Sequence, residues 1–336
     1  MITRSEVLAA AIVIVSLVPV WVAGQGGAPT ADTANLRTGW GDPDLQGVWT
    51  YKTITPLERP AELADKRVLT DEEAAIFERE ENQRLNRDLI DPTKGGYIYA
   101  PESEGGVIPY NDFWYDRGTE VIETRQTSLI VDPVDGLLPS LTPEAQRQAD
   151  AAPPREDQRG RPRADSYVDR PLSERCLLMG NASPMLSGAY NNNVQVFQTP
   201  GYVVLLNEMI HDTRIIPLDG RPHLPGHVRS WLGDSRGHWE GDALVVETTN
   251  FSEKRSFRGS SESMTLVERF RRIDADTVAY EFTVDDAPTW TRPWTVAFPL
   301  SRMQDEIYEY ACHEGNYSIA GVLGGARADE VRADAR

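Results

Sequence analysis

Residues 264–284 decide the fold of this chain, and they read MTLVERFRRIDADTVAYEFTV. Two strand-like runs, Met264–Ile273 and Thr277–Val284, flank a short polar segment that contains Asp274 and Asp276. Two such runs around a turn signal predict an antiparallel β-hairpin. Runs of the same kind precede and follow this hairpin, so the pattern extends well beyond it.

The second half of the chain consists mostly of such runs, separated by short turns. We predict further strands at Asp44–Tyr51, Val194–Gln198, Tyr202–Ile210, Ala243–Thr249, Trp294–Leu300 and Ile307–Cys312, and a strand or hairpin within Thr119–Val131. We interpret Ser235–Asp242 as a turn-like connection. Successive strands with few helices predict a mainly β fold, an antiparallel up-and-down meander closed into a barrel, with a β-sandwich as the alternative.

Two short helices are predicted, both in the N-terminal half of the chain. Thr70 and Glu73 form the ends of a capping-box pattern, which predicts a helix from Asp71 to about Arg87. The dipeptide Thr142-Pro143 opens a second helix, because Pro suits the first helical turn.

The predicted elements define one domain with flexible ends. We expect a single β-rich domain at residues 44–325, a helical insertion at about 57–90, a linker-like insertion at about 150–170, a flexible N-terminal segment at 25–43 and a flexible tail at 326–336.

The first 24 residues have the pattern of a secretory signal peptide. Arg4 precedes an apolar run from Val7 to Val22, and the small residues Ala23 and Gly24 follow it. A membrane anchor is the alternative, but the run is short for a bilayer span. We therefore expect a periplasmic or secreted protein with no stable membrane insertion after cleavage.

The net charge limits the classes of binding partner, and the two cysteines bear on the redox state of the compartment. With 52 Asp and Glu against 34 Lys and Arg, the formal net charge is −18, which argues against nucleic acid and anionic membrane surfaces as partners. The two cysteines, Cys176 and Cys312, form one disulfide in an exported protein, or stay as two buried thiols. The oligomeric state is not specified.

Two resemblances rest on short motifs. The run Gly47-Val48-Trp49 resembles the calycin group, the lipocalins and their relatives, in which a Gly-x-Trp strand starts the barrel and the Trp closes one end. Residues 189–195, 208–223, 233–242 and 310–316 together resemble a large group of secreted bacterial proteins with no assigned activity. The second resemblance implies export and a common fold, and no catalytic residue.

Ionisable residues are concentrated where the predicted strand Tyr202–Ile210 turns polar. Glu208, His211, Asp212 and Arg214 lie within seven positions. Charged groups in a strand need partners, so this density indicates either a structural ion-pair network or a site.

The site interpretation is an acid–base centre for a small molecule. A His beside a carboxylate can move a proton near neutral pH. We expect His211 and His313 as acid and base, with Glu208 or Asp212 orienting an imidazole. The expected substrate-binding residues are Arg214, Arg221, Asn193 and Trp231.

No cofactor is predicted, and a divalent transition metal is the alternative left open. His223 and His227 are four positions apart, but Pro225 and Gly226 between them exclude a regular helix. On a loop both rings can still converge on a metal ion. The competing interpretation is that these histidines only pair with carboxylates.

Two functions from different classes remain. The first is an exported enzyme, a lyase, isomerase or hydrolase, acting on a small organic or sugar-derived substrate in a cavity. The second is a periplasmic ligand-binding protein of lipocalin type without turnover. A Gly-x-Ser-x-Gly motif is missing, which disfavours a serine hydrolase.

Overall fold

The computed structural model describes residues 36–86, 88, 112–152, 163–179, 182–255 and 257–335. The predicted signal peptide, residues 25–35 of the predicted flexible segment and residues 153–162 of the predicted linker lie outside this part of the chain. No helix among the described residues is both long and apolar enough to cross a membrane.

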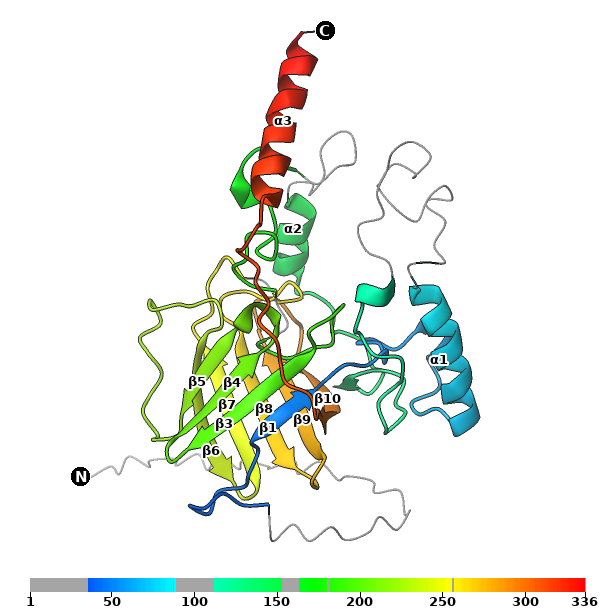
Figure 1. Ribbon diagram of the computed structural model, residues 1–336, viewed down its shortest axis with the longest axis vertical. Coiled ribbons are helices and arrows are strands. Elements are labelled where there is room, and N and C mark those ends of the chain that lie inside the picture. Colours follow the sequence, from blue (N-terminus) through cyan, green and yellow to red (C-terminus); the bar gives the residue numbers. More distant parts are fainter. Residues whose placement is uncertain are drawn as a thin grey trace, which may run out of the picture. The chain divides into compact units, whose positions relative to one another are not determined.

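The described chain forms a nearly closed antiparallel β-barrel, as the sequence predicts (Figure 1). Nine strands follow one another in the order β5-β4-β3-β1-β10-β9-β8-β7-β6, and β2 pairs with β10. The end strands β5 and β6 lie in contact at the seam. The strands are β1 (Gly47–Thr50), β2 (Ile130–Asp132), β3 (Asn193–Thr199), β4 (Tyr202–Asn207), β5 (Thr213–Pro217), β6 (Asp234–Glu240), β7 (Ala243–Thr249), β8 (Thr265–Arg272), β9 (Thr277–Asp285) and β10 (Trp294–Arg302).

The barrel interior is filled by alternate side chains from its strands. On β9, Tyr280 and Phe282 point inward, and on β10 Trp294 and Phe298 do so. The rings of Tyr280 and Phe298 pack edge to face at 5.3 Å. Full burial of each such side chain contributes about 1.5–3 kcal/mol to the free energy of folding, so these residues stabilise the closed sheet.

The described helices are α1 (Asp71–Leu85), α2 (Pro143–Ala151) and α3 (Ser318–Asp334). The capping box at Thr70 is present, and α1 ends two residues before the predicted Arg87. Helix α3 includes most of the residues predicted as a flexible tail, and their flexibility stays a prediction. Arg327 in α3 donates to the carbonyls of Asp165 (2.7 Å) and Ala164 (3.1 Å), which gives this helix a partner in the chain.

The predicted strand Tyr202–Ile210 is too long, because β4 ends at Asn207. Residues Met209–His211 form a 3-10 turn, in which Ile210 and His211 have positive φ angles of 56° and 48°. The left-handed region breaks an extended strand, so the polar run forms the connection between β4 and β5.

Three other sequence interpretations are corrected. Most of Ser235–Asp242 is strand β6, and only Gly241 and Asp242 make the hairpin turn, with φ of 61° at Gly241. The segment Ile307–Cys312 is not a strand in the described chain, because its Tyr308 amide bonds the Glu208 side chain instead of a neighbouring strand. Within Thr119–Val131 only the last residues belong to a strand, β2.

Candidate functional site

A cleft of about 900 Å³ lies against the outer face of the barrel at β1 and β3. Val194 and Val196 of β3 face the core, so Asn193 projects to the opposite side and lines this cleft. The segment that follows β10 forms the facing wall with Tyr308 and Tyr310. The volume falls in the range of about 300–1,000 Å³ that is typical of small-molecule sites.

Two residues predicted from the sequence meet in the cleft. The Asn193 side-chain amide donates to Glu208 Oε2 at 2.7 Å, and the Tyr308 amide donates to Glu208 Oε1 at 3.0 Å. The Glu208 backbone N–H also donates to the Asn193 carbonyl at 3.0 Å. Both side chains are held in one geometry, and Glu208 keeps further lone pairs for a ligand donor.

Aromatic rings form the walls of the cleft. The rings of Tyr190 and Tyr310 are stacked, with centroids 6.3 Å apart and planes inclined by 17°. Tyr115 meets the edge of Tyr190 at 6.4 Å. Trp114 and Tyr308 also line the cleft. Rigid aromatic faces suit the apolar side of a ring-shaped ligand.

The charges in the cleft are mainly negative. Four carboxylates line it, from Asp116, Glu208, Asp305 and Glu306, against the two cations Lys52 and Arg302. Lys52 pairs with Asp116 at 3.0 Å, and a second cavity of about 510 Å³ adjoins at these residues and Thr50. The excess of carboxylates disfavours an anionic ligand.

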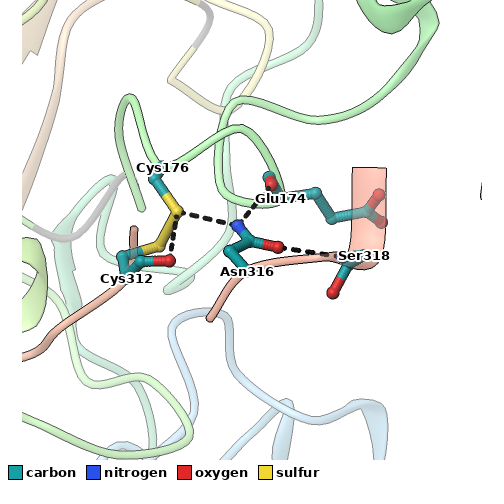
Figure 2. Close-up of a disulfide and its surroundings, with 5 residues drawn as sticks. All are labelled: Glu174, Cys176, Cys312, Asn316 and Ser318. Atoms are coloured by element: carbon teal, nitrogen blue, oxygen red, sulfur yellow. Dashed lines mark hydrogen bonds between the residues drawn. A yellow bond between two sulfur atoms is a disulfide. The ribbon is translucent and has the colours of Figure 1, made fainter. Parts of the chain in front are cut away.

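The disulfide ties the C-terminal wall of the cleft to the body of the protein (Figure 2). Cys176 and Cys312 form a disulfide with their Cα atoms 5.7 Å apart. Of the two alternatives predicted from the sequence, a disulfide or two buried thiols, the structure contains the disulfide. The Asn316 amide donates to Cys176 Sγ at 3.1 Å and to the Glu174 carbonyl at 3.4 Å. These bonds hold the segment that carries Tyr308 and Tyr310.

A second polar cluster lies inside the barrel. Arg214 on β5 makes a bidentate ion pair with Glu268 on β8, and both side chains are almost fully buried. The Tyr280 hydroxyl donates to Glu268 Oε1 at 2.7 Å, and burial raises the pKa of this phenol well above its usual range. Burial disfavours the charge on Arg214, but the attraction of Glu268 outweighs it and the pKa of Arg214 is raised. Arg214, which was predicted to bind a substrate, is thus paired with Glu268 in the interior and does not line the cleft.

Three further ionisable groups have pKa values shifted by burial near the interior cluster. Burial, followed by repulsion from Arg214, lowers the pKa of Arg255 to about 10. Burial raises the pKa of Asp212 to about 6, against the attraction of Arg255. Burial and then the charges of Glu208 and Asp212 raise the pKa of Tyr51. Asp212 is therefore coupled to the interior and does not line the cleft.

Neither of the two proposed acid–base histidines lines the cleft. His211 and His313 are both exposed, and neither imidazole has a polar partner among the described residues. The positive φ of His211 places it in a turn and not on a strand that faces a cavity. The assignment of these residues as acid and base stays a prediction.

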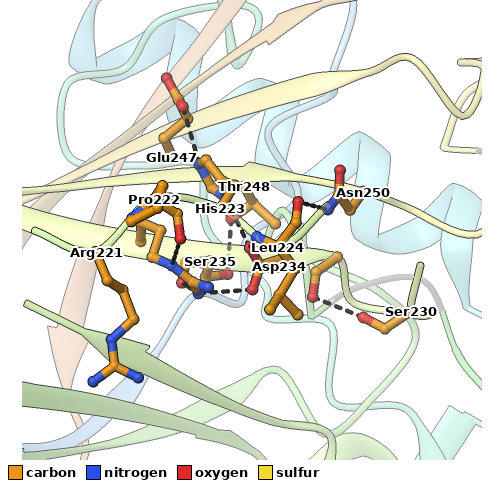
Figure 3. A network of polar contacts seen from close by, with 12 residues as sticks. Arg221, Pro222, His223, Leu224, Ser230, Asp234, Ser235, Glu247, Thr248 and Asn250 are labelled. Atoms are coloured by element: carbon orange, nitrogen blue, oxygen red, sulfur yellow. Dashed lines mark hydrogen bonds and ion pairs between the residues drawn. The ribbon is translucent and has the colours of Figure 1, made fainter. Parts of the chain in front are cut away.

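The remaining predicted binding residues also lie outside the cleft. Arg221 is exposed and pairs with Asp219, whose pKa it lowers to about 2 through hydrogen bonds. Figure 3 shows its guanidinium directed away from His223. Trp231 is half-buried and does not line the cleft described above.

His223 is bound by carboxylates on both sides (Figure 3). Its Nδ1 lies 2.9 Å from Asp234 Oδ2 and its Nε2 lies 3.0 Å from Glu247 Oε1. His227 is exposed. Within the described ranges, no three His, Cys, Asp or Glu side chains are grouped so that they could hold a metal ion. His223 thus pairs with carboxylates, which is the alternative to metal binding that the sequence left open.

Comparison with known proteins gives no match: no protein-family model, no curated protein and no solved structure is similar to the chain.

The sequence reasoning missed Tyr190, Tyr308 and Tyr310 in the cleft and Glu268 and Arg255 in the interior. Only Glu268 carried a usable signal, because it alternates with Leu266 and Phe270 on β8 and therefore shares their buried face. The three tyrosines lie in irregular segments, where no periodicity assigns a side to a residue.

Proposed function

We propose that this is an exported protein whose cleft binds a neutral or positively charged ring compound of sugar-derivative size. The single observation that carries the proposal is the cleft, which is lined both by stacked tyrosines and by a carboxylate that Asn193 holds. An aromatic face binds the C–H side of a sugar ring, and a fixed carboxylate accepts from its hydroxyl or ammonium groups.

Export is part of the same proposal. It is supported by the signal-peptide pattern of the first 24 residues and by the disulfide between Cys176 and Cys312, because disulfides persist in oxidising compartments. The Gly47-x-Trp49 strand supports a calycin-like relationship. Trp49 is completely buried, and the guanidinium groups of Arg272 and Arg302 lie 4.6 Å and 5.5 Å from the centre of its ring.

Binding without turnover is the function that the geometry supports best. Each Glu208 oxygen accepts one hydrogen bond from the protein, and these bonds fix the position of the carboxylate. A carboxylate fixed in this way is suited to anchoring a ligand through its remaining lone pairs. Acid–base turnover is the second candidate, favoured by the adjacent carboxylates of Asp305 and Glu306 in the same cleft.

Three probes that share one ring test the proposal: glucosamine, glucose and glucuronate, which differ in charge. We expect saturation-transfer NMR on the disulfide-bonded protein to rank binding in that order, with glucuronate weakest. Equal binding of all three, or binding of glucuronate alone, would contradict the proposal, and so would no binding at all. New resonances during prolonged incubation would identify turnover.

A further inference from the structure

The barrel end that carries the β4–β5 and β7–β8 connections contains a buried cation that is hydrogen-bonded to no carboxylate of the described residues. Arg255 is only 4% exposed. One of its nitrogens, Nη2, donates to the Ser183 carbonyl, while Nε and Nη1 are buried without a hydrogen-bond partner among the described residues. Leaving two guanidinium donors unpaired in an apolar surrounding is costly, so such groups usually have a partner.

A second guanidinium contacts the same serine. Arg214 Nη1 is 3.4 Å from Ser183 Oγ, and its Nε is also buried and unpaired in the described chain. The two outer nitrogens of Arg214 donate to Glu268, whereas Arg255 makes no hydrogen bond to this carboxylate. Among the described residues, Arg255 Nε, Arg255 Nη1 and Arg214 Nε are therefore buried donors without a partner, and Ser183 contacts both guanidinium groups.

The remaining neighbours of Arg255 supply only part of a counter-charge. Its guanidinium lies over the rings of Phe251 and Phe257, at 4.7 Å and 5.9 Å from their centres, which stabilises a cation but accepts no hydrogen bond. The charged groups that act on it are Arg214, Glu268 and Asp212. Asp212 makes no hydrogen bond with Arg255, and its Oδ2 has no partner in the described part of the chain.

We propose that a small inorganic anion such as chloride binds beside Ser183, between the guanidinium groups of Arg255 and Arg214. Guanidinium N–H groups in a water-poor site bind anions strongly, because little solvent screens the charge. This site is separate from the cleft and does not depend on the function proposed for it. The competing occupant is a water molecule that bridges the same groups.

Bromide is the probe, since it replaces chloride and scatters anomalously. Thermal unfolding of the full protein is compared in bromide and in gluconate at equal ionic strength. At ten times its dissociation constant, bromide should raise Tm by about 3 °C in a saturable manner. Arg255→Gln should lose this shift, while Arg258→Gln, an exposed arginine of the same loop, should retain it.

A crystal grown in bromide gives a second test that needs no variant. The proposal expects an anomalous peak within hydrogen-bond distance of Arg255 Nη1 or Nε. It is overturned by equal Tm values in bromide and gluconate, by a saturable shift that survives in Arg255→Gln, or by a water molecule at this position without anomalous signal.

Discussion

Arg214 and Glu268 are 54 positions apart in the chain, yet they form a bidentate ion pair in the interior of the barrel, with Arg214 Nη2 2.9 Å from Glu268 Oε1. The pair joins β5 to β8 across the packed core. Ions buried this deeply gain little net stability over apolar side chains, but each depends strongly on the other.

Glu268→Gln should therefore destabilise the protein strongly. Removing one charge leaves Arg214 buried without compensation, and we expect a loss of about 3–5 kcal/mol in the free energy of unfolding, measured with urea. The double variant Arg214→Met with Glu268→Leu should recover most of the loss. A double variant as unstable as Glu268→Gln would contradict this account of the pair.

Asp212 should make stability depend on pH between about 4 and 6. Its pKa is raised from 3.8 to about 6, so the folded state binds the proton more tightly than the unfolded chain. The corresponding stability is present below pH 4 and is lost as pH rises through 6. Asp212→Asn should remove this slope and stabilise the protein at pH 7 by about 1 kcal/mol, after allowance for solvent screening.

The control for this prediction is Asp219→Asn. The pKa of the exposed Asp219 is lowered to about 2, so its stability contribution changes below pH 4 and with the opposite sign. Urea titrations across pH 4 to 7 should show the slope unchanged in this variant. An unchanged slope in Asp212→Asn would refute the assignment to Asp212.

Gly47→Ala should destabilise the start of the barrel. Gly47 has φ of 136°, and a Cβ there would lie 3.1 Å from Arg302 Nη1, one of the groups over Trp49. We expect a cost of about 1–3 kcal/mol in urea unfolding. Gly226→Ala is the matched control, because nothing lies within 4 Å of its added Cβ. Equal stability of the two variants would contradict the role given to Gly47.

Replacing Cys176 and Cys312 by serine should affect both stability and binding. The disulfide closes a sequence separation of 136 residues, so its loss should cost about 3–5 kcal/mol. It should also weaken glucosamine binding, because Tyr308 and Tyr310 lie on the segment that the disulfide holds. Calorimetric titration below the unfolding transition measures the second effect. Unchanged affinity would show that the C-terminal wall is positioned without the disulfide.

The barrel could be predicted from the sequence because its strands are marked locally. The hairpin of β8 and β9 has apolar residues in alternation on both sides of a polar turn, and both strands lie close to their predicted bounds. Strand β6 was missed since its residues include Gly237, His238 and Glu240, which resemble a turn. The pairing of Ser235 Oγ with Thr248 Oγ1 at 2.9 Å depends on a partner strand that local patterns do not reveal.

The candidate site could be predicted only in part. Glu208 and Asn193 were selected for their charge and amide character, and they meet because β3 and β4 form one hairpin. The rest of the cleft depends on long-range contacts. Tyr308 reaches Glu208 from 100 positions away, and a backbone amide that bonds a side chain has no sequence signature.

The most direct test of the cleft is a calorimetric titration of glucosamine into the disulfide-bonded protein and its Glu208→Gln variant. Losing the charge at the centre of the polar wall should weaken binding about tenfold, roughly 1.4 kcal/mol. Glu253→Gln, which makes the same change at an exposed position outside the cleft, should bind as the unmodified protein does. Equal affinity in Glu208→Gln, or no binding heat for the unmodified protein, would contradict the proposed function.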